Sequence, residues 1–267
     1  KFVVISGKNG AGKTNLLEAV SLLVSGKGLR GANLADMKNR KLPESFLWSV
    51  AGDVNSISGE AIKVGTGLDK TLAKRLIRIN GQDAKSQSDL DEQMAIIWLT
   101  PQMDRLFLES ASERRKFFDR LVMAYEPSHS TYINRYEKAM RERLKLLQED
   151  NNPDAIWLNA LEKQMAESAV VIAAGRINLI NHLQQHIVAL NAISPMFPEP
   201  LLELENFLEN DLAKAPASKV QEDFKNILEK NRFIDKETKR TTEGSHRVNL
   251  KVTYKEKNIP AEQCSTG

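Results

Sequence analysis

The residues with the clearest chemical potential lie near the start of the chain, in the run GKNGAGKT from Gly7 to Thr14. Its spacing fits the phosphate-binding pattern G-x-x-x-x-G-K-[ST] in full. Glycines in such a loop let backbone N–H groups face one anion, and a helix that starts near Lys13 adds its positive dipole end. The Lys13 ammonium would bind the β- and γ-phosphates, and the Thr14 hydroxyl would bind Mg²⁺. The pattern therefore predicts a site for ATP or GTP.

The elements that must position this loop are a strand before it and a helix after it. The run KFVVIS, residues 1–6, is typical of a buried strand, and NLLEAVSLLV, residues 15–24, has a helical period. Short alternating pieces over residues 48–80 predict an antiparallel meander with turns at Gly59, at residues 65–67 and at residues 80–81. The run MAIIWLT, residues 94–100, predicts a second buried strand.

After Pro101 the chain changes to long helical periodicity. Apolar residues recur at spacings of three and four from Ile133 to Leu147 and again from Leu158 to Leu190. Between the two seams, EDNNPDAI predicts a break, with Asn152 as a helix cap and Pro153 at the first helical position. We expect an antiparallel helical hairpin, a less regular helical stretch to about residue 235, and a returning strand from residue 247.

Sequence features outside residues 7–14 indicate which class of nucleotide-binding protein this chain resembles. The chain has no N-K-x-D guanine motif, and its long helical arm differs from the short arginine-bearing lid of small-molecule kinases. An ABC-type head has a glutamine after a strand, then a helical lobe, then a serine-glycine loop. Gln102 follows residues 94–100, and Ser265, Thr266 and Gly267 close the chain. Gln102 is a candidate nucleotide-sensing and Mg²⁺-binding residue, although a glutamine after proline is also unremarkable.

Several further runs resemble the RecF family of bacterial recombination-repair ATPases. They are SERRKFFDRLV, GSHR, GKGLR, YINRYEKAMRERLKLL and the final STG, in addition to GKNGAGKTNLLEAV. The resemblance covers most of the chain and is weakest over residues 191–239. It implies an α/β ABC-type ATPase head with a short inserted helical arm. It also implies binding of ATP with Mg²⁺, dimerisation on ATP, binding of duplex or gapped DNA, and loading of recombinase with RecO and RecR in the bacterial cytoplasm.

The family's functional residues are carried over by position. The nucleotide-binding positions that match are Gly7, Asn9, Gly10, Ala11, Gly12, Lys13, Thr14 and Asn15. Ser265 and Gly267 match the start of the family's signature loop, which in such heads covers the γ-phosphate held by the other subunit. The resemblance therefore implies that CSTG is half of a composite site; a plain tail is the alternative.

The family's Walker B segment, an apolar strand ending in acids, follows the signature loop. No such strand lies within residues 1–267, and the strand that precedes the P-loop strand in the family is also missing. We expect the sequence to continue at both ends, since it opens at Lys1 inside an apolar run and stops within a motif. A weak DNA-stimulated ATPase activity is accordingly expected of the full-length protein, and hydrolysis by these residues alone is left open.

Composition and charge set broad limits. Apolar residues make up 41% and charged residues 27% of 267 residues, and no apolar run approaches 18 residues, so no membrane span is expected. No positively charged stretch precedes an apolar one at the start, so no signal peptide is expected. One cysteine, Cys264, suits a reducing cytoplasm. The net charge of +3 neither demands nor excludes nucleic acid. Candidate DNA contacts cluster between residues 26 and 41: Lys27, Arg30, Lys38, Arg40 and Lys41. A solvated face is the alternative there, and for the five acids over residues 199–211.

Other candidate residues have plainer interpretations. His246 and Arg247 match a family pair that lines the head's interface, with an ordinary surface turn as the alternative. Arg114 and Arg115 open a helix and are expected to lie on a solvated face. His182 and His186, four apart on a helix, have no third ligand nearby in sequence, so no metal site is expected. Cys264 is expected to be an unreactive small residue.

These observations predict an α/β P-loop NTPase, an ABC-ATPase-like head with an inserted antiparallel helical arm (lobe II). The expected parts are an ATP-binding lobe over residues 1–100, a helical arm over 101–240, and a returning strand with the start of the signature loop over 241–267. The expected function is ATP-switched DNA binding in recombinational repair and replication-fork maintenance. Two alternatives stay open: an SMC-type chromosome-organising head, and a non-hydrolysing repair interaction module.

Overall fold

The computed structural model describes residues 2–37, 43, 47–55, 59–69, 74–149, 154–194 and 198–264. The chain divides into two compact units, residues 1–98 and residues 99–267. No helix in the described ranges is both long and apolar enough to cross a membrane.

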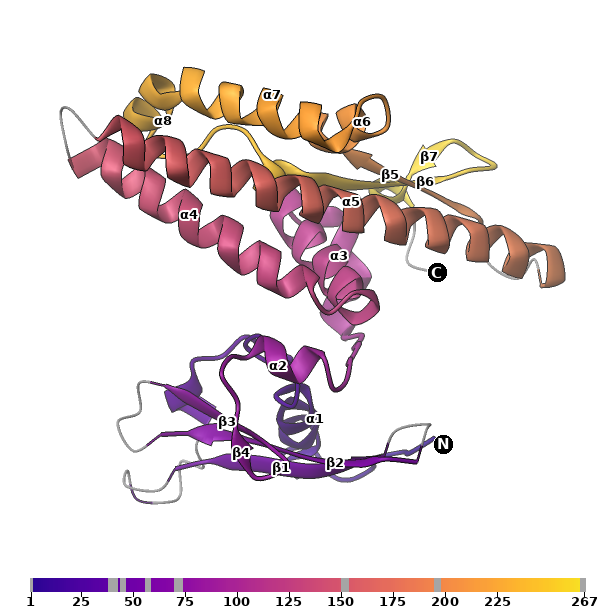
Figure 1. Ribbon diagram of the computed structural model, residues 1–267. Helices are drawn as coiled ribbons and strands as arrows, with labels where there is room; N and C mark the ends of the chain where they lie inside the picture. Colours follow the sequence, from indigo (N-terminus) through magenta and orange to yellow (C-terminus); the bar gives the residue numbers. More distant parts are fainter. Residues whose placement is uncertain are drawn as a thin grey trace. The chain divides into compact units, whose positions relative to one another are not determined.

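The first unit is built on a four-stranded antiparallel meander in the order β1-β2-β3-β4. Its elements are α1 (Lys13–Ser21), β1 (Ser49–Asn55), β2 (Ala61–Leu68), β3 (Arg75–Ile79), β4 (Gln82–Asp83) and α2 (Ser88–Asp91). Leu23 and Leu90, at the ends of the α1 and α2 segments, pack on Val64 and Ile77 of the strands. Both helices therefore lie over one face of the sheet (Figure 1).

The predicted meander is confirmed, but one of the turns predicted within it, at residues 65–67, is wrong. Asn80 and Gly81 have φ values of 51° and 83° and form the tight β3–β4 hairpin turn, as Asn-Gly predicts. Residues 65–67, in contrast, run through the middle of β2. Gly67 is there because the backbone of the neighbouring strand comes close: a Cβ at this position would lie 2.9 Å from the Trp48 carbonyl oxygen.

The two strands predicted at either end of this unit are also absent. Residues 2–6 and residues 94–100 are extended, and neither segment pairs with a strand among the residues that the structure covers. Phe2 and Val4 are therefore almost fully exposed. Met94 and Ile96 pack on the meander, while Ile97 and Leu99 on the other side face solvent. A strand needs a hydrogen-bonding neighbour as well as an apolar sequence, and the described residues supply none to these segments.

The second unit is a layer of helices against a small antiparallel sheet in the order β5-β6-β7. Its helices are α3 (Ala111–Tyr125), α4 (His129–Glu149), α5 (Ala155–Ile193), α6 (Phe207–Leu212), α7 (Ala217–Lys230) and α8 (Arg232–Thr238). Its strands are β5 (Pro200–Glu205), β6 (Asn249–Tyr254) and β7 (Ile259–Pro260). Short 3-10 turns occupy Pro101–Leu108, Ser245–Arg247 and Ala261–Gln263.

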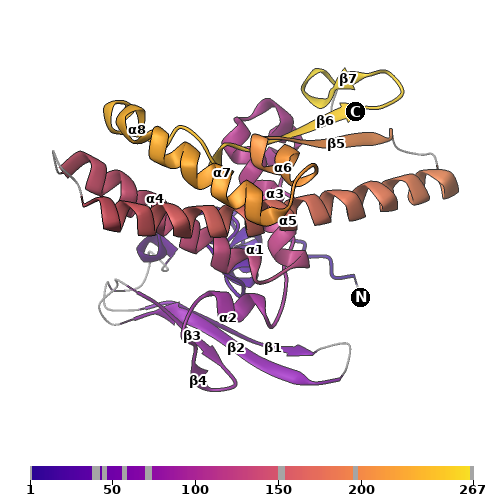
Figure 2. The ribbon, with the colours of Figure 1, turned by 45° about the horizontal axis from the view of Figure 1, so that its top comes forward.

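The predicted helical hairpin is confirmed as α4 and α5, which lie side by side and antiparallel (Figures 1 and 2). The seam residues Tyr136, Leu161 and Met165 are buried in one core with Phe224 and Leu228 of α7. α5 has 39 residues, about 58 Å at 1.5 Å per residue. Such an arm is far shorter than the arms of several hundred residues expected of an SMC-type head.

The predicted capping of α5 is wrong by two residues. Asp154 caps the helix, its carboxylate accepting hydrogen bonds from the Ile156 and Trp157 N–H groups, and the helix begins at Ala155. Asp and Asn are equally good helix caps. The helix begins after Asp154 because the Asp154 carboxylate accepts hydrogen bonds from two N–H groups of the first turn. Asn152 and Pro153 lie outside the described residues.

The strand β5 was not predicted, because a less regular helical stretch was expected to run to about residue 235. PLLELE alternates apolar and acidic residues, and its register sets Glu203 opposite Lys251 of β6. Lys251 also approaches Glu205, and Lys255 pairs with Glu199 at 2.5 Å. The acids near residue 200 thus face lysines of the returning strand at the surface, where such pairs contribute little stability.

Candidate nucleotide site

The loop over residues 7–12 has the backbone that the glycine pattern requires. Gly7, Gly10 and Gly12 have φ values of 154°, 84° and 93°, a region that residues with a Cβ rarely occupy. A Cβ at Gly10 or Gly12 would have no neighbour within 4 Å, so conformation rather than space explains these two glycines. The loop ends directly in α1, with Gly12 at the cap position.

The first turn of α1 is free to receive an anion. No side chain caps it and it holds no acidic residue, so its N–H groups and dipole are not used within the described protein. Lys13 folds back over the loop, and its ammonium donates hydrogen bonds to the carbonyl oxygens of Gly7 at 2.6 Å and Lys8 at 2.9 Å. The positive charge is therefore already held inside the loop.

The structure brings all eight predicted nucleotide-binding residues together in the loop and the first turn. Asn9 and Gly10 lie at the tip of the loop, and Ala11 donates its N–H to the Lys8 carbonyl at 3.2 Å. Thr14 and Asn15 follow on the exposed side of α1. A phosphate chain with its Mg²⁺ fits this donor set, because it offers N–H groups, one ammonium and one hydroxyl on an accessible surface.

Sequence reasoning missed Glu18, which fixes the next loop to α1. Glu18 is 7% exposed, and its carboxylate accepts the Arg30 N–H at 3.1 and 3.3 Å. The Arg30 guanidinium lies 3.9 Å from the same carboxylate and donates a long bond of 3.5 Å to the Asn15 side chain. The Ser21 hydroxyl accepts the Leu29 N–H at 2.7 Å. The loop of residues 25–30 is therefore held beside the nucleotide-binding turn.

Two candidate DNA contacts can be placed on this loop. Lys27 is exposed at its tip, whereas the Arg30 side chain is partly engaged by Glu18 and Asn15. Lys38, Arg40 and Lys41 lie outside the described residues.

Gly28 offers a direct test of this packing. It has φ of 74°, and a Cβ there would lie 2.7 Å from Glu18 Oε1 and 3.0 Å from Leu22. Gly26 has φ of 95° with nothing within 4 Å, so Gly26→Ala is the matched control. We expect Gly26→Ala to cost about 1 kcal/mol of unfolding free energy through backbone strain. Gly28→Ala should cost about 1–3 kcal/mol more. Urea unfolding measures both, and equal costs would show that the contact with Glu18 is not tight.

Arg75, also missed, joins this helix segment to the meander. Its guanidinium donates to the carbonyl oxygens of Leu22, Val24 at 3.0 Å and Gly26 at 2.8 Å, and to the Thr66 hydroxyl at 2.7 Å. Burial lowers the pKa of Arg75, but a guanidinium stays charged at any physiological pH. The Arg75 side chain of β3 thus supplies hydrogen-bond donors to the carbonyl groups that follow α1, and it holds this segment against β2 and β3.

Gln102, the other predicted catalytic residue, belongs to the second unit. It is exposed in the first turn of the 3-10 helix Pro101–Leu108, which Thr100 precedes as cap. Its side chain carries no hydrogen bond to another described group that would fix it. Gln102 is therefore accessible to a ligand or a second subunit.

The prediction that Arg114 and Arg115 lie on a solvated face is wrong. Arg114 donates to the Asn249 side chain at 2.8 and 3.0 Å and to the carbonyl oxygens of Phe107 and Glu109. Arg115 donates to the His246 carbonyl and, at 3.2 Å, to Ser112. The two guanidinium groups therefore tie α3 to the Asn249 side chain of β6 and to carbonyl groups in or beside the 3-10 turns Pro101–Leu108 and Ser245–Arg247, which need donors.

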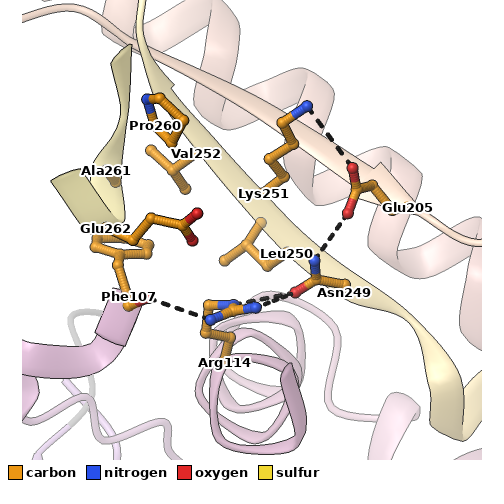
Figure 3. Close-up of a pocket in the computed structure, with 10 residues that line it drawn as sticks. All are labelled: Phe107, Arg114, Glu205, Asn249, Leu250, Lys251, Val252, Pro260, Ala261 and Glu262. Atoms are coloured by element: carbon orange, nitrogen blue, oxygen red, sulfur yellow. Dashed lines mark hydrogen bonds and ion pairs between the residues drawn. The ribbon is translucent and has the colours of Figure 1, made fainter. Parts of the chain in front are cut away.

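Beside Arg114 lies a cavity of about 180 Å³ (Figure 3). Figure 3 shows the Glu262 carboxylate pointing into it, opposite Arg114, with Asn249 bridging Arg114 and Glu205. Glu262 belongs to the turn before Cys264, which is exposed. Ser265 and Gly267 lie outside the described residues, so their predicted place in a composite site stays a prediction.

His246 is engaged inside the second unit and does not lie in an ordinary surface turn. Its Nε2 lies 2.9 Å from the Thr241 carbonyl, which can only accept, so Nε2 carries the proton and Nδ1 accepts from the Tyr136 hydroxyl at 2.9 Å. Burial lowers the pKa of His246, in keeping with a neutral ring. Arg247 is exposed.

The histidine pair on α5 lies away from these features. His182 packs against the Tyr125 ring with centroids 5.3 Å apart, and His186 is exposed. Within the ranges that the structure describes, no three His, Cys, Asp or Glu residues are grouped so as to hold a metal ion.

Comparison with known proteins gives consistent results. The AAA domain family matches residues 1–265. A protein of Agrobacterium fabrum named "DNA replication and repair protein RecF" is 41% identical over 269 residues, covering 100% of this chain and 70% of the relative. A protein of the same name in Mesorhizobium japonicum is 43% identical over 267 residues, covering 99% of this chain and 69% of the relative.

Solved structures agree on the fold. One, described as the recombination mediator protein RecF-ATP in the RecFOR pathway, has a TM-score of 0.81 at 22% identity and covers 96% of this chain and 67% of its own. Its counterpart with ATPrS has a TM-score of 0.80 at 23% identity. Together with the AAA match, they confirm the predicted P-loop NTPase fold of mixed helix and sheet.

Proposed function

Because this chain belongs to the RecF family of DNA replication and repair proteins, we propose that it is an ATP-switched DNA-binding protein of recombinational repair. The observation that carries the proposal is the glycine loop of residues 7–12 running into an uncapped helix, with the Lys13 ammonium held inside it. This arrangement supports recognition of a triphosphate, since it offers positive charge and N–H donors without any competing acid.

In this proposal residues 1–100 hold the nucleotide, residues 101–240 form the arm, and residues 241–267 lead into the signature loop. Lys13 exchanges its bonds with the loop carbonyls for bonds to the phosphates. The Thr14 hydroxyl would ligate Mg²⁺, and Gln102 is proposed as a nucleotide-sensing and Mg²⁺-binding residue. Bound Mg²⁺ would neutralise phosphate charge. The loop N–H groups and Lys13 would orient the phosphate chain.

The switch in this proposal is the joining of two subunits. Ser265 and Gly267 of one subunit would cover the γ-phosphate held by the other, so ATP is bound fully only in the dimer. Because ATP then stabilises the dimer relative to the monomers, it also stabilises whatever the dimer holds. We propose that the dimer holds duplex DNA at a gap, in the bacterial cytoplasm during the response to DNA damage. Lys27 and neighbouring basic residues would bind the phosphates of this DNA.

Hydrolysis and partners complete the proposal. The chain spans about 70% of the curated relatives' length, and a catalytic carboxylate is assigned to none of its residues. Weak, DNA-stimulated ATPase activity is proposed for the whole protein, with hydrolysis releasing DNA. RecO- and RecR-type proteins are the proposed partners in loading recombinase.

DNA binding with and without nucleotide tests the switch. We expect the dissociation constant for a fluorescently labelled gapped duplex to fall about tenfold when ATP and Mg²⁺ are added, a coupling within the usual range. Fluorescence anisotropy at a fixed salt concentration measures it, because phosphate contacts weaken steeply with salt. The same affinity with ATP, with ADP and without nucleotide would refute the switch and favour a non-hydrolysing interaction module.

A further inference from the structure

The far end of the helical arm exposes an apolar surface that no part of the proposed nucleotide or DNA function uses. We propose that this surface, formed by Ile156, Trp157, Phe233 and Ile234 and called the arm-tip surface below, binds an acidic protein segment that carries apolar anchors. The four side chains are 81%, 55%, 74% and 50% exposed. Exposed aromatic residues such as Trp157 and Phe233 are enriched at protein-binding surfaces.

The two pairs of residues lie at the same end of the arm, on helices that side-chain hydrogen bonds join. Arg232, directly before Phe233, donates to the Asn159 side chain at 2.6 Å and to the Glu162 carboxylate. The start of α8 therefore lies against the first two turns of α5. Ile156 is three residues before Asn159 and so is on the same face of α5. Both ribbon views place α8 at the same end of the arm as the start of α5 (Figures 1 and 2).

The exposure of these residues does not come from a loose helix end. Asp154, two residues before Ile156, caps α5 by accepting the Ile156 N–H at 2.8 Å. Beneath the surface, the buried Arg143 donates to Glu162 at 2.9 Å and to Asp235 of α8 at 2.6 Å. These bonds lock α4, α5 and α8 together, so the arm-tip surface is rigid before any partner binds. A rigid surface loses little entropy on binding.

The positive charge around the arm-tip surface favours an acidic partner. Residues 229–240 contain five Lys or Arg and three acids, and one of those acids, Asp235, is buried against Arg143. Exposed Lys163, Lys230, Lys239 and Arg240 make no ion pair with any residue in the described ranges. An acidic segment would supply the missing partners at the rim, while its apolar side chains cover the centre.

A protein fits this surface better than a nucleic acid. Bases bind proteins without sequence preference by stacking on flat aromatic rings. Half of the apolar centre here consists of branched isoleucine side chains, which cannot stack but do pack against apolar protein side chains. We therefore assign the arm-tip surface to a protein partner and leave duplex DNA as an outcome of the test.

Peptide binding to the whole protein tests the assignment. The probe is a fluorescein-labelled peptide of about 16 residues with Phe and Leu spaced among Asp and Glu; one control replaces Phe and Leu by Ser, the other replaces Asp and Glu by Lys. We expect wild-type protein to bind the probe at least tenfold more tightly than either control. Ile156→Asp and Phe233→Ser should each weaken probe binding about tenfold, as for central interface residues.

The chain supplies a closely matched control. Ile193, 83% exposed, is the same residue type at the opposite end of the same helix, so Ile193→Asp should change probe binding less than twofold. Lys13→Ala should also leave it unchanged, which separates this inference from the nucleotide function. Thermal unfolding by circular dichroism should be unaltered in all variants, because the substituted side chains are exposed.

Three results would overturn the inference. They are equal binding of the probe and its Ser control, equal weakening by Ile156→Asp and Ile193→Asp, and displacement of the probe by duplex DNA that itself binds about tenfold less tightly to Phe233→Ser. The last would reassign the surface to nucleic acid.

Discussion

Replacing Lys13 by alanine is expected to weaken ATP binding at least a hundredfold while the protein stays folded. The Lys13 ammonium is placed between the carbonyl oxygens of Gly7 and Lys8, where it would meet the phosphates. Two hydrogen bonds between charged groups contribute roughly 3–6 kcal/mol together, which is about a hundred- to ten-thousandfold in affinity. Stability should change little, since the two carbonyl oxygens can bond to water on the exposed loop. Isothermal titration calorimetry with ATP and Mg²⁺ measures the loss.

Lys8→Ala is the control for this experiment. It removes the same charge from the same loop, but Lys8 takes part in the described hydrogen bonding through its backbone, as acceptor for Lys13 and for the Ala11 N–H. We expect Lys8→Ala to weaken ATP binding less than about fivefold, the effect of one screened surface charge. If the two variants lose affinity equally, then general positive charge rather than the position of the Lys13 ammonium determines binding, and the assignment of Lys13 fails.

The parts of the site that follow from short-range constraints could be predicted from the sequence. The P-loop is one: glycines at fixed spacing, a lysine and a helix start determine its conformation within about ten residues. The Asn80-Gly81 turn and the α4–α5 hairpin are others, because turn chemistry and helical periodicity are local signals. Each of these predictions is confirmed by the backbone.

Contacts between distant residues could not be predicted in the same way. Glu18 lies within the run GKNGAGKTNLLEAV and Arg75 lies in no motif, but neither position indicates its partner: Glu18 fixes the Arg30 loop, and Arg75 bonds to carbonyl groups about fifty residues earlier in the chain. Arg114 was placed in solvent because charged residues usually are, whereas its partner Asn249 lies 135 residues away. A single sequence gives no signal for such pairs.

Strand predictions failed for a related reason. Apolar β-branched runs at residues 2–6 and 94–100 satisfy every local criterion for strands, but pairing depends on a neighbour that local sequence does not specify. The strand β5 shows the converse, since its partner β6 gives the weak alternation of PLLELE a definite register.

Arg176 occupies the centre of a buried polar cluster of the second unit, and it is 2% exposed. From α5 it donates to both Asp119 oxygens of α3, at 2.8 and 3.0 Å, and to Glu209 of α6 at 3.3 Å. It also donates to the Ser245 carbonyl and hydroxyl, both at 2.9 Å. One guanidinium therefore joins the arm to three elements that local sequence patterns leave unconnected.

Replacing Arg176 by methionine, which keeps most of the volume, should lower the unfolding free energy by about 3–5 kcal/mol at pH 7, because two carboxylates stay buried without their cation. The control is Arg135→Met, which breaks the half-exposed pair with Glu167 on the same arm and should cost less than about 1 kcal/mol. Urea unfolding followed by circular dichroism compares them. Equal costs would mean that the cluster does not stabilise the unit.

The pH dependence of the unfolding free energy lost in Arg176→Met shows whether the ion pair or packing causes the loss. Burial alone would raise the pKa of Asp119, but the Arg176 charge, with hydrogen bonds from His129 and Arg176, outweighs burial and holds this pKa at about 2. Because the folded-state pKa is below the ordinary value of 3.8, wild type keeps this stabilisation above pH 3.8 and loses it as pH falls towards 2.

Without Arg176, burial dominates, so Asp119 should take up a proton at higher pH and relieve the buried charge. The difference in unfolding free energy between wild type and Arg176→Met should therefore shrink as pH is lowered from 7 to 4. A difference independent of pH would indicate lost packing, because only the loss of the ion pair makes the cost depend on the protonation of Asp119.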